Sequence, residues 1–100
     1  MYLIHVRLGA PGDVAPPPDL ARIIASCAEE ADGLGHVTVH GEDPGETTVG
    51  LFTAAAGLAE AEESAARVVR RAVAAHSGLS GFAVVSVEAV LVPGPWWGDT

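Results

Sequence analysis

Hydrophobic side chains change their spacing near Gly57, where a predicted strand gives way to a long helix. Before this glycine, Val49 and Leu51 alternate with residues of the opposite face, as expected for a strand with two unlike sides. After it, apolar positions recur at steps of three and four and form one helical stripe, which comprises Leu58, Ala61, Ala65, Val68, Ala72 and His76. The segment from Thr47 to His76 is therefore predicted to organise the fold.

The first part of the chain shows the same succession of strand and helix. Alternation predicts a strand over Met1 to Leu8, and a proline-rich loop then leads to a helix over Pro18 to Ala31. Gly33 is expected to end this helix, because glycine adopts the left-handed cap conformation at little cost. The stripe that faces the core is predicted to comprise Leu20, Ile23, Ile24, Cys27 and Ala31.

A hairpin is predicted between the two helices. Its first strand covers His36 to His40, and the acidic segment Gly41 to Glu46 forms its turn. Pro44 and Gly45 suit the two central positions of that turn.

The last strand is predicted over Phe82 to Val92, and Pro93 ends it. Residues 1–92 then form a single domain, and residues 93–100 form a tail rich in proline and tryptophan. The side chains of this strand that face the core are predicted to be Val85, Val87, Ala89 and Leu91.

The order of elements predicts a fold class. Each helix connects two strands, and right-handed crossovers place another strand between each connected pair. The expected fold is an α+β ferredoxin-like βαββαβ sandwich, with a four-stranded antiparallel sheet of order 4-1-3-2 and two helices on one face. The other face of the sheet has no cover within the chain.

The charge balance argues against binding to nucleic acid. The chain of 100 residues has a net charge of −8, with five arginines and no lysine. Nucleic-acid binding needs several cations on one face. On the second helix, Glu63 and Arg67 stand four positions apart, a spacing that favours an ion pair worth about 0.3–0.5 kcal/mol.

Cys27 is the only cysteine, which argues against a disulfide framework and a cysteine-based zinc site. The N-terminal segment lacks a signal-peptide layout, and no apolar run approaches the ~20 residues that cross a bilayer. We expect a cytoplasmic protein that does not associate with membranes and that uses no cofactor and no metal.

The uncovered sheet face is predicted to carry most of the polar side chains of the strands. Pairing of the first and last strands brings Glu88 opposite His5 or Arg7. The contact is either structural or a catalytic couple, in which Glu88 orients His5 and raises its pKa for proton transfer. The predicted face comprises Leu3, His5, Arg7, His36, Thr38, His40, Thr48, Gly50, Phe52, Val84, Ser86, Glu88 and Val90.

Two features of this face have more than one interpretation. His36 and His40 lie ~13 Å apart on a strand that rises ~3.3 Å per residue, so we expect exposed edge residues rather than a shared metal site. Gly50 stands in mid-strand, where glycine leaves room for a ligand or a partner backbone, or marks a bulge.

The uncovered face also favours assembly. Exposed apolar surface commonly marks an interface, and two copies packed sheet against sheet would bury it. Trp96 and Trp97 in the tail add a second candidate, because tryptophan is enriched at interface hot spots. The tail packs on its own domain, crosses to a partner subunit or docks on another protein. The apolar residues of the face are Leu3, Phe52, Val84 and Val90.

The segment GLFTAAAGLAEAEESAARVV resembles the strand, short turn and Leu-x-x-Ala-x-x-x-Ala segment of small ferredoxin-like proteins of the dimeric α+β barrel type. These include the antibiotic-biosynthesis monooxygenase-like and YCII-like groups. The resemblance covers the layout of the domain and implies this fold. It transfers no catalytic residue, and the fold hosts enzymes, regulators and interaction modules alike.

Three functional hypotheses follow. The first is a non-catalytic accessory or regulatory protein that acts through homodimerisation or on a protein partner. The second is a small cofactor-free enzyme acting on a hydrophobic metabolite, with His5 as acid and base, Glu88 as its orienter and Arg7 as an anion holder. The third is a sensor that binds such a small molecule without turnover. The candidate ligand or interface residues are Arg7, His36, Thr38, His40, Gly50, Phe52, Ser86, Val90, Trp96 and Trp97.

Overall fold

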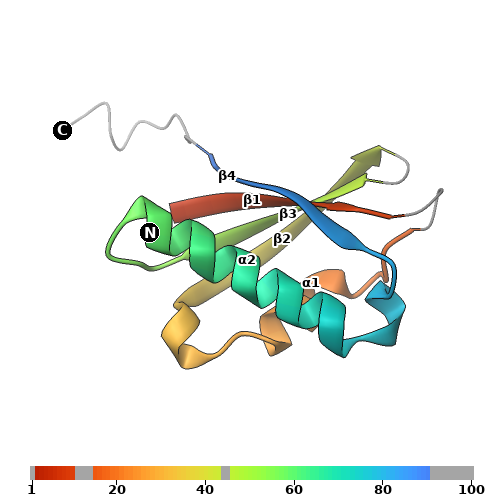
Figure 1. Cartoon of the computed structure of the whole chain (residues 1–100), viewed down its shortest axis with the longest axis horizontal. Helices are drawn as coiled ribbons and strands as arrows, with labels where there is room; N and C mark the ends of the chain where they lie inside the picture. Colours follow the sequence, from red (N-terminus) through yellow and green to blue (C-terminus); the bar gives the residue numbers. More distant parts are fainter. Residues whose placement is uncertain (1, 11–14, 44–45, 91–100) are drawn as a thin grey trace.

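A computed structural model of the chain describes residues 2–10, 15–43 and 46–90. Strands and helices follow one another in the predicted order (Figure 1). The elements are β1 (Tyr2–Gly9), α1 (Leu20–Ser26), the short 3-10 helix η1 (Glu30–Asp32), β2 (Leu34–Asp43), β3 (Glu46–Thr53), α2 (Leu58–Ala75), the short 3-10 helix η2 (Ser77–Leu79) and β4 (Ala83–Ala89).

The strands form one antiparallel sheet of order β2-β3-β1-β4. Read from the other edge this is 4-1-3-2, so the predicted strand order is confirmed. Both helices pack on the same side of the sheet and share one core with it (Figure 1). Helix α1 lies against β2, and α2 lies against β1 and β4.

The core sits between this sheet face and the helices. Alternate side chains of β1 and β3 enter it, including Ile4, Val6 and Leu51, which are fully buried. Burial of a side chain of this size stabilises a fold by roughly 1.5–3 kcal/mol. Helix α2 contributes a stripe of mostly small residues that lies directly on the sheet, comprising Ala61, Ala65, Val68, Val69 and Ala72. Leu58, predicted on this stripe, is the first residue of the helix and is 45% exposed.

The first helix is shorter than predicted. It ends at Ser26, whose hydroxyl donates to the carbonyl of Ile23, and a separate 3-10 turn follows. That turn is closed by the carboxylate of Asp32, which accepts the backbone N–H of Glu29 at 2.8 Å. Such side-chain bonds to the backbone compete with helix continuation. Ala31, predicted in the buried stripe, is consequently exposed.

Gly33 has the predicted left-handed conformation, with φ of 67°, but it ends the 3-10 turn rather than α1. A Cβ at this position would clash with the carbonyl oxygen of Ala54. The backbones are held at this distance by a hydrogen bond of 2.8 Å from the Ala54 N–H to the Gly33 carbonyl.

The last strand contains a β-bulge that the alternation did not predict. Leu8 pairs with Val84 whereas Arg7 pairs with Ser86, so Val85 is the extra residue. Val84, predicted on the open face, packs against the core, and Val85, predicted in the core, is 61% exposed. Beyond the bulge Val87 faces the core as predicted.

The hairpin and the chain end differ from the prediction in extent. Strand β2 runs on to Asp43, which pairs with Glu46, so only Pro44 and Gly45 separate the paired positions. Those two residues, Leu91 and the tail 93–100 lie outside the described residues.

No helix in the described part of the chain is long and apolar enough to cross a membrane.

Candidate functional site

The sheet surface opposite the helices, called here the open face, carries three rows of side chains. Each row crosses the strands because directly opposed residues of an antiparallel pair point to the same side. From β2 to β4 the rows are His40–Thr48–Arg7–Ser86, Thr38–Gly50–His5–Glu88 and His36–Phe52–Leu3, and Val90 extends the last row. The predicted face is therefore reproduced, with the exception of Val84.

Two histidines from strands that are not neighbours meet on this face. His5 of β1 and His40 of β2 have ring centroids 5.9 Å apart, with an angle of 47° between the planes. Strand β3 runs between them, and the residue at the crossing point is Gly50. The Nε2 atom of His40 lies 3.2 Å from the hydroxyl of Thr38, which orients its ring.

The mid-strand glycine is explained by these neighbours. A Cβ at Gly50 would lie 2.6 Å from the Thr38 hydroxyl and 3.5 Å from Cδ2 of His5. Gly50 keeps a regular register with both adjacent strands, so it does not mark a bulge. The space that the missing side chain leaves is used by side chains of this chain, and this is what brings His5 close to His40.

His5 lies directly opposite Glu88, as predicted, but its pKa does not move as predicted. Burial and the neighbouring His40 lower the pKa of His5 below its ordinary value, and Glu88 opposes them only in part. Glu88 therefore acts in the expected direction, but the pKa of His5 is lowered overall because burial and His40 outweigh it. The ion pairs within 4.0 Å in the described part of the chain do not include one between these two side chains.

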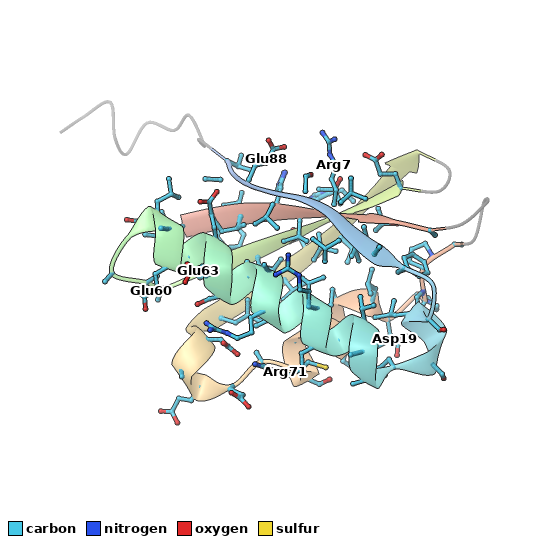
Figure 2. All side chains as sticks on the ribbon, in the orientation of Figure 1. Arg7, Asp19, Glu60, Glu63, Arg71 and Glu88 are labelled. Atoms are coloured by element: carbon cyan, nitrogen blue, oxygen red, sulfur yellow. The ribbon has the colours of Figure 1, made fainter. Side chains whose placement is uncertain are left out.

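The charged residues of the open face point away from the helices, as Figure 2 shows for Arg7 and Glu88. Arg7 pairs with Glu46 of β3, with Nε 3.5 Å from Oε1, and both side chains are about half exposed. Ser86 stands opposite Arg7, and its buried hydroxyl has no hydrogen-bond partner among the described residues. An isolated buried hydroxyl is unfavourable unless something else satisfies it.

The third row is apolar. Leu3 and Phe52 are opposed and partly exposed, and Val90 is tied to Leu3 by a backbone hydrogen bond of 2.9 Å. The ring of His36 lies against Phe52, with centroids 6.1 Å apart. His36 and His40 thus have different aromatic neighbours, in keeping with the distance expected along a strand. Trp96 and Trp97 lie outside the described residues.

The sequence analysis missed a second polar cluster, which surrounds Asp32 on the other side of the molecule. This carboxylate is only 3% exposed. Arg67 donates through Nε to Oδ1 at 3.1 Å, and Arg71 donates through Nη1 to Oδ2 at 3.1 Å. Arg71 also donates to the carbonyl of Cys27 at 2.6 Å. The two arginines of α2 therefore fasten the segment between α1 and β2 to that helix.

The electrostatics of this cluster favour a charged carboxylate. Burial alone would raise the pKa of Asp32, but the N–H of Glu29 and the guanidinium groups of Arg71 and Arg67 outweigh it and lower the pKa. Arg67 also donates to the hydroxyl of Ser64 at 3.1 Å, so among the described residues it contacts Asp32 and Ser64 rather than the predicted partner Glu63. All acceptors of the cluster are engaged by the arginines and the backbone, which is typical of a structural ion-pair network.

Among the described residues, the open face thus has polar groups that are not all engaged by other groups of the chain. It offers an imidazole whose pKa is lowered by burial, a second histidine beside it, a hydroxyl without a hydrogen-bond partner and an apolar row. The contact between His5 and His40 was not predicted because histidines were compared only along one strand. The predicted strand order, together with the mid-strand Gly50, could have indicated that His5 and His40 approach each other across β3.

Comparison of the chain with protein-family models, curated proteins and solved structures found no match in any of the three.

Proposed function

We propose that this protein is a non-catalytic interaction module with a ferredoxin-like fold, which acts by packing its open face against a second copy of itself. In this respect it would function as the dimeric α+β barrel proteins do. A protein partner that offers a similar sheet surface is the alternative occupant.

The observation that carries the proposal is the apolar third row of the open face. Leu3 and Phe52 are partly exposed on a sheet whose other side alone is covered by helices. An antiparallel sheet can present one face to water, but that face then carries mainly polar side chains. Apolar side chains grouped on such a face favour an interface.

The charges of the face support pairing with a second copy. Arg7 and Glu88 stand in adjacent rows on neighbouring strands, so the face carries both signs. In a two-fold interface residue i of one copy contacts residue j of the other and j contacts i, so a face with both signs allows Arg7 of one copy to pair with Glu88 of the other. The net charge of −8 opposes association, and we therefore expect the dimer to be favoured by moderate salt.

Two parts of the proposal rest on sequence. Trp96 and Trp97 are proposed as additional interface anchors, on the ground that tryptophan is frequent at hot spots. A cytoplasmic location is proposed because the single cysteine, Cys27, is free and a reducing compartment suits it.

The test is the molar mass in solution, measured by light scattering over a range of protein concentrations. The intact chain is expected to be a dimer, and Phe52→Glu is expected to be a monomer because it places a charge in the apolar row. Val85→Glu is the matched control, since this residue is 61% exposed on the edge strand and lies outside the rows. A chain truncated after Pro93 tests the contribution of the tail.

The outcomes separate the possible interfaces. Loss of the dimer in Val85→Glu but not in Phe52→Glu would place the contact at the β4 edge and contradict the proposal. An intact chain that stays monomeric at every concentration would reject self-association through the open face. Circular dichroism of each variant shows whether a changed mass reflects unfolding.

A further inference from the structure

The pair formed by His5 and His40 has a geometry close to that of two ligands of one metal ion. Zinc binds imidazole nitrogen at about 2.0–2.1 Å, and two imidazoles at a tetrahedral angle then have ring centres about 5 Å apart. The centroids of His5 and His40 are 5.9 Å apart.

The surroundings of the pair fit a metal ion as well. Gly50 leaves no side chain between the rings, and Cδ2 of His5 approaches the space above it. The hydroxyl of Thr38 lies 3.2 Å from Nε2 of His40 and can orient that ring, as outer groups do for histidine ligands. Glu88, opposite His5, adds negative charge, and the only arginine in the three rows, Arg7, is paired with Glu46.

We propose that His5 and His40 together bind one divalent transition-metal ion, with Zn²⁺, Ni²⁺ or Cu²⁺ as the ions that imidazole suits. Within the described residues no group of three or more His, Cys, Asp or Glu side chains is placed to hold a metal. The site is therefore a two-histidine site, and water fills the remaining coordination positions. The site lies on the open face, in the two rows beside the apolar third row.

The experiment is a titration of the full chain with ZnCl₂, followed by the histidine ring signals in NMR and by calorimetry. We expect the ring signals of His5 and His40 to shift together and to saturate at one Zn²⁺ per chain. Loss of an outer-shell partner alone typically costs about 10–100-fold in metal affinity, so His5→Gln and His40→Gln should each weaken binding by about tenfold or more.

The chain supplies matched controls. His36 and His76 are the other two histidines, and His36→Gln and His76→Gln should leave the affinity within twofold. Cys27→Ser should do the same, because the thiol is not part of the pair. Each variant replaces a residue outside the buried core, and an unchanged amide spectrum verifies its fold.

Several results would overturn the site. They are an affinity retained in His40→Gln, an equal loss in His36→Gln, or a titration in which Zn²⁺ moves neither ring signal. Saturation at one Zn²⁺ per two chains would mean that ligands come from two copies, and it would overturn a site built from one chain. Zn²⁺ affinity and molar mass are separate measurements, so loss of this site in His5→Gln or His40→Gln can be distinguished from loss of the dimer in Phe52→Glu.

Discussion

Arg71 of α2 donates through Nη1 to Oδ2 of Asp32 at 3.1 Å, across 39 positions of sequence. The same carboxylate accepts Arg67 through its other oxygen, and the backbone of Glu29 completes its partners. This contact holds the segment between α1 and β2 on the long helix, and it joins the two halves of the chain through side chains.

Replacing Asp32 with Asn should destabilise the protein. The variant keeps the shape of the side chain but loses its charge, and hydrogen bonds to a charged group are worth about 1.5–3 kcal/mol. We expect a loss of about that size in the free energy of unfolding, measured by urea titration. Glu63→Gln is the control and should change it by less than about 0.5 kcal/mol, because Glu63 is exposed. An equal effect of both variants would contradict the assigned role of Asp32.

The contribution of Asp32 should depend on pH in a defined direction. Its pKa in the folded protein is lower than the ordinary value of 3.8, so the unfolded chain takes up the proton first as the pH falls. The stabilisation is present above pH 3.8 and is lost as the pH falls through the folded pKa. The difference in urea midpoint between the native protein and Asp32→Asn should therefore be constant from neutral pH down to about 5, and it should shrink below 3.8. A gap that widens on acidification would reverse the assigned direction of the pKa.

Gly50→Ala should disturb the open face. The added Cβ would stand 2.6 Å from the hydroxyl of Thr38, so that side chain must move. Overpacking of this kind typically costs about 1–3 kcal/mol in unfolding free energy. In the double variant with Thr38→Ala the cost of the glycine change should fall, which a double-mutant cycle measures. Additive effects would mean that the two residues do not compete for the same space.

The bulge in β4 makes opposite predictions for two adjacent valines. Val84 packs on the core, so Val84→Ala should cost about 1 kcal/mol in unfolding free energy. Val85 is 61% exposed, and Val85→Ala should change it by less than about 0.5 kcal/mol. The free energies of unfolding of the two variants, measured by thermal or urea unfolding under the same conditions, test this prediction. A larger loss of stability in Val85→Ala than in Val84→Ala would indicate a strand with regular alternation and would rule out the bulge.

Local periodicity was sufficient to predict much of this fold. The core residues of β1 and β3 and the stripe of α2 from Ala61 to Ala72 were identified correctly, because in these elements each side chain is placed by the repeat of its own backbone. The strand order was also correct, since two right-handed crossovers leave few alternatives. The side chains of the open face followed from the same alternation.

The sequence by itself therefore determined the elements, their order and which face of each strand is buried. The tertiary structure decided what depends on contacts between distant residues. Helix α1 ends at Ser26, and the segment after it folds around Asp32, whose arginine partners lie 35 and 39 positions away. The bulge at Val85 depends on the register with β1, and the meeting of His5 with His40 depends on the absence of a side chain at Gly50 in the strand between them. A period read along one strand contains no information about which residues of another strand lie beside it, and for that reason the histidine pair became visible only in three dimensions.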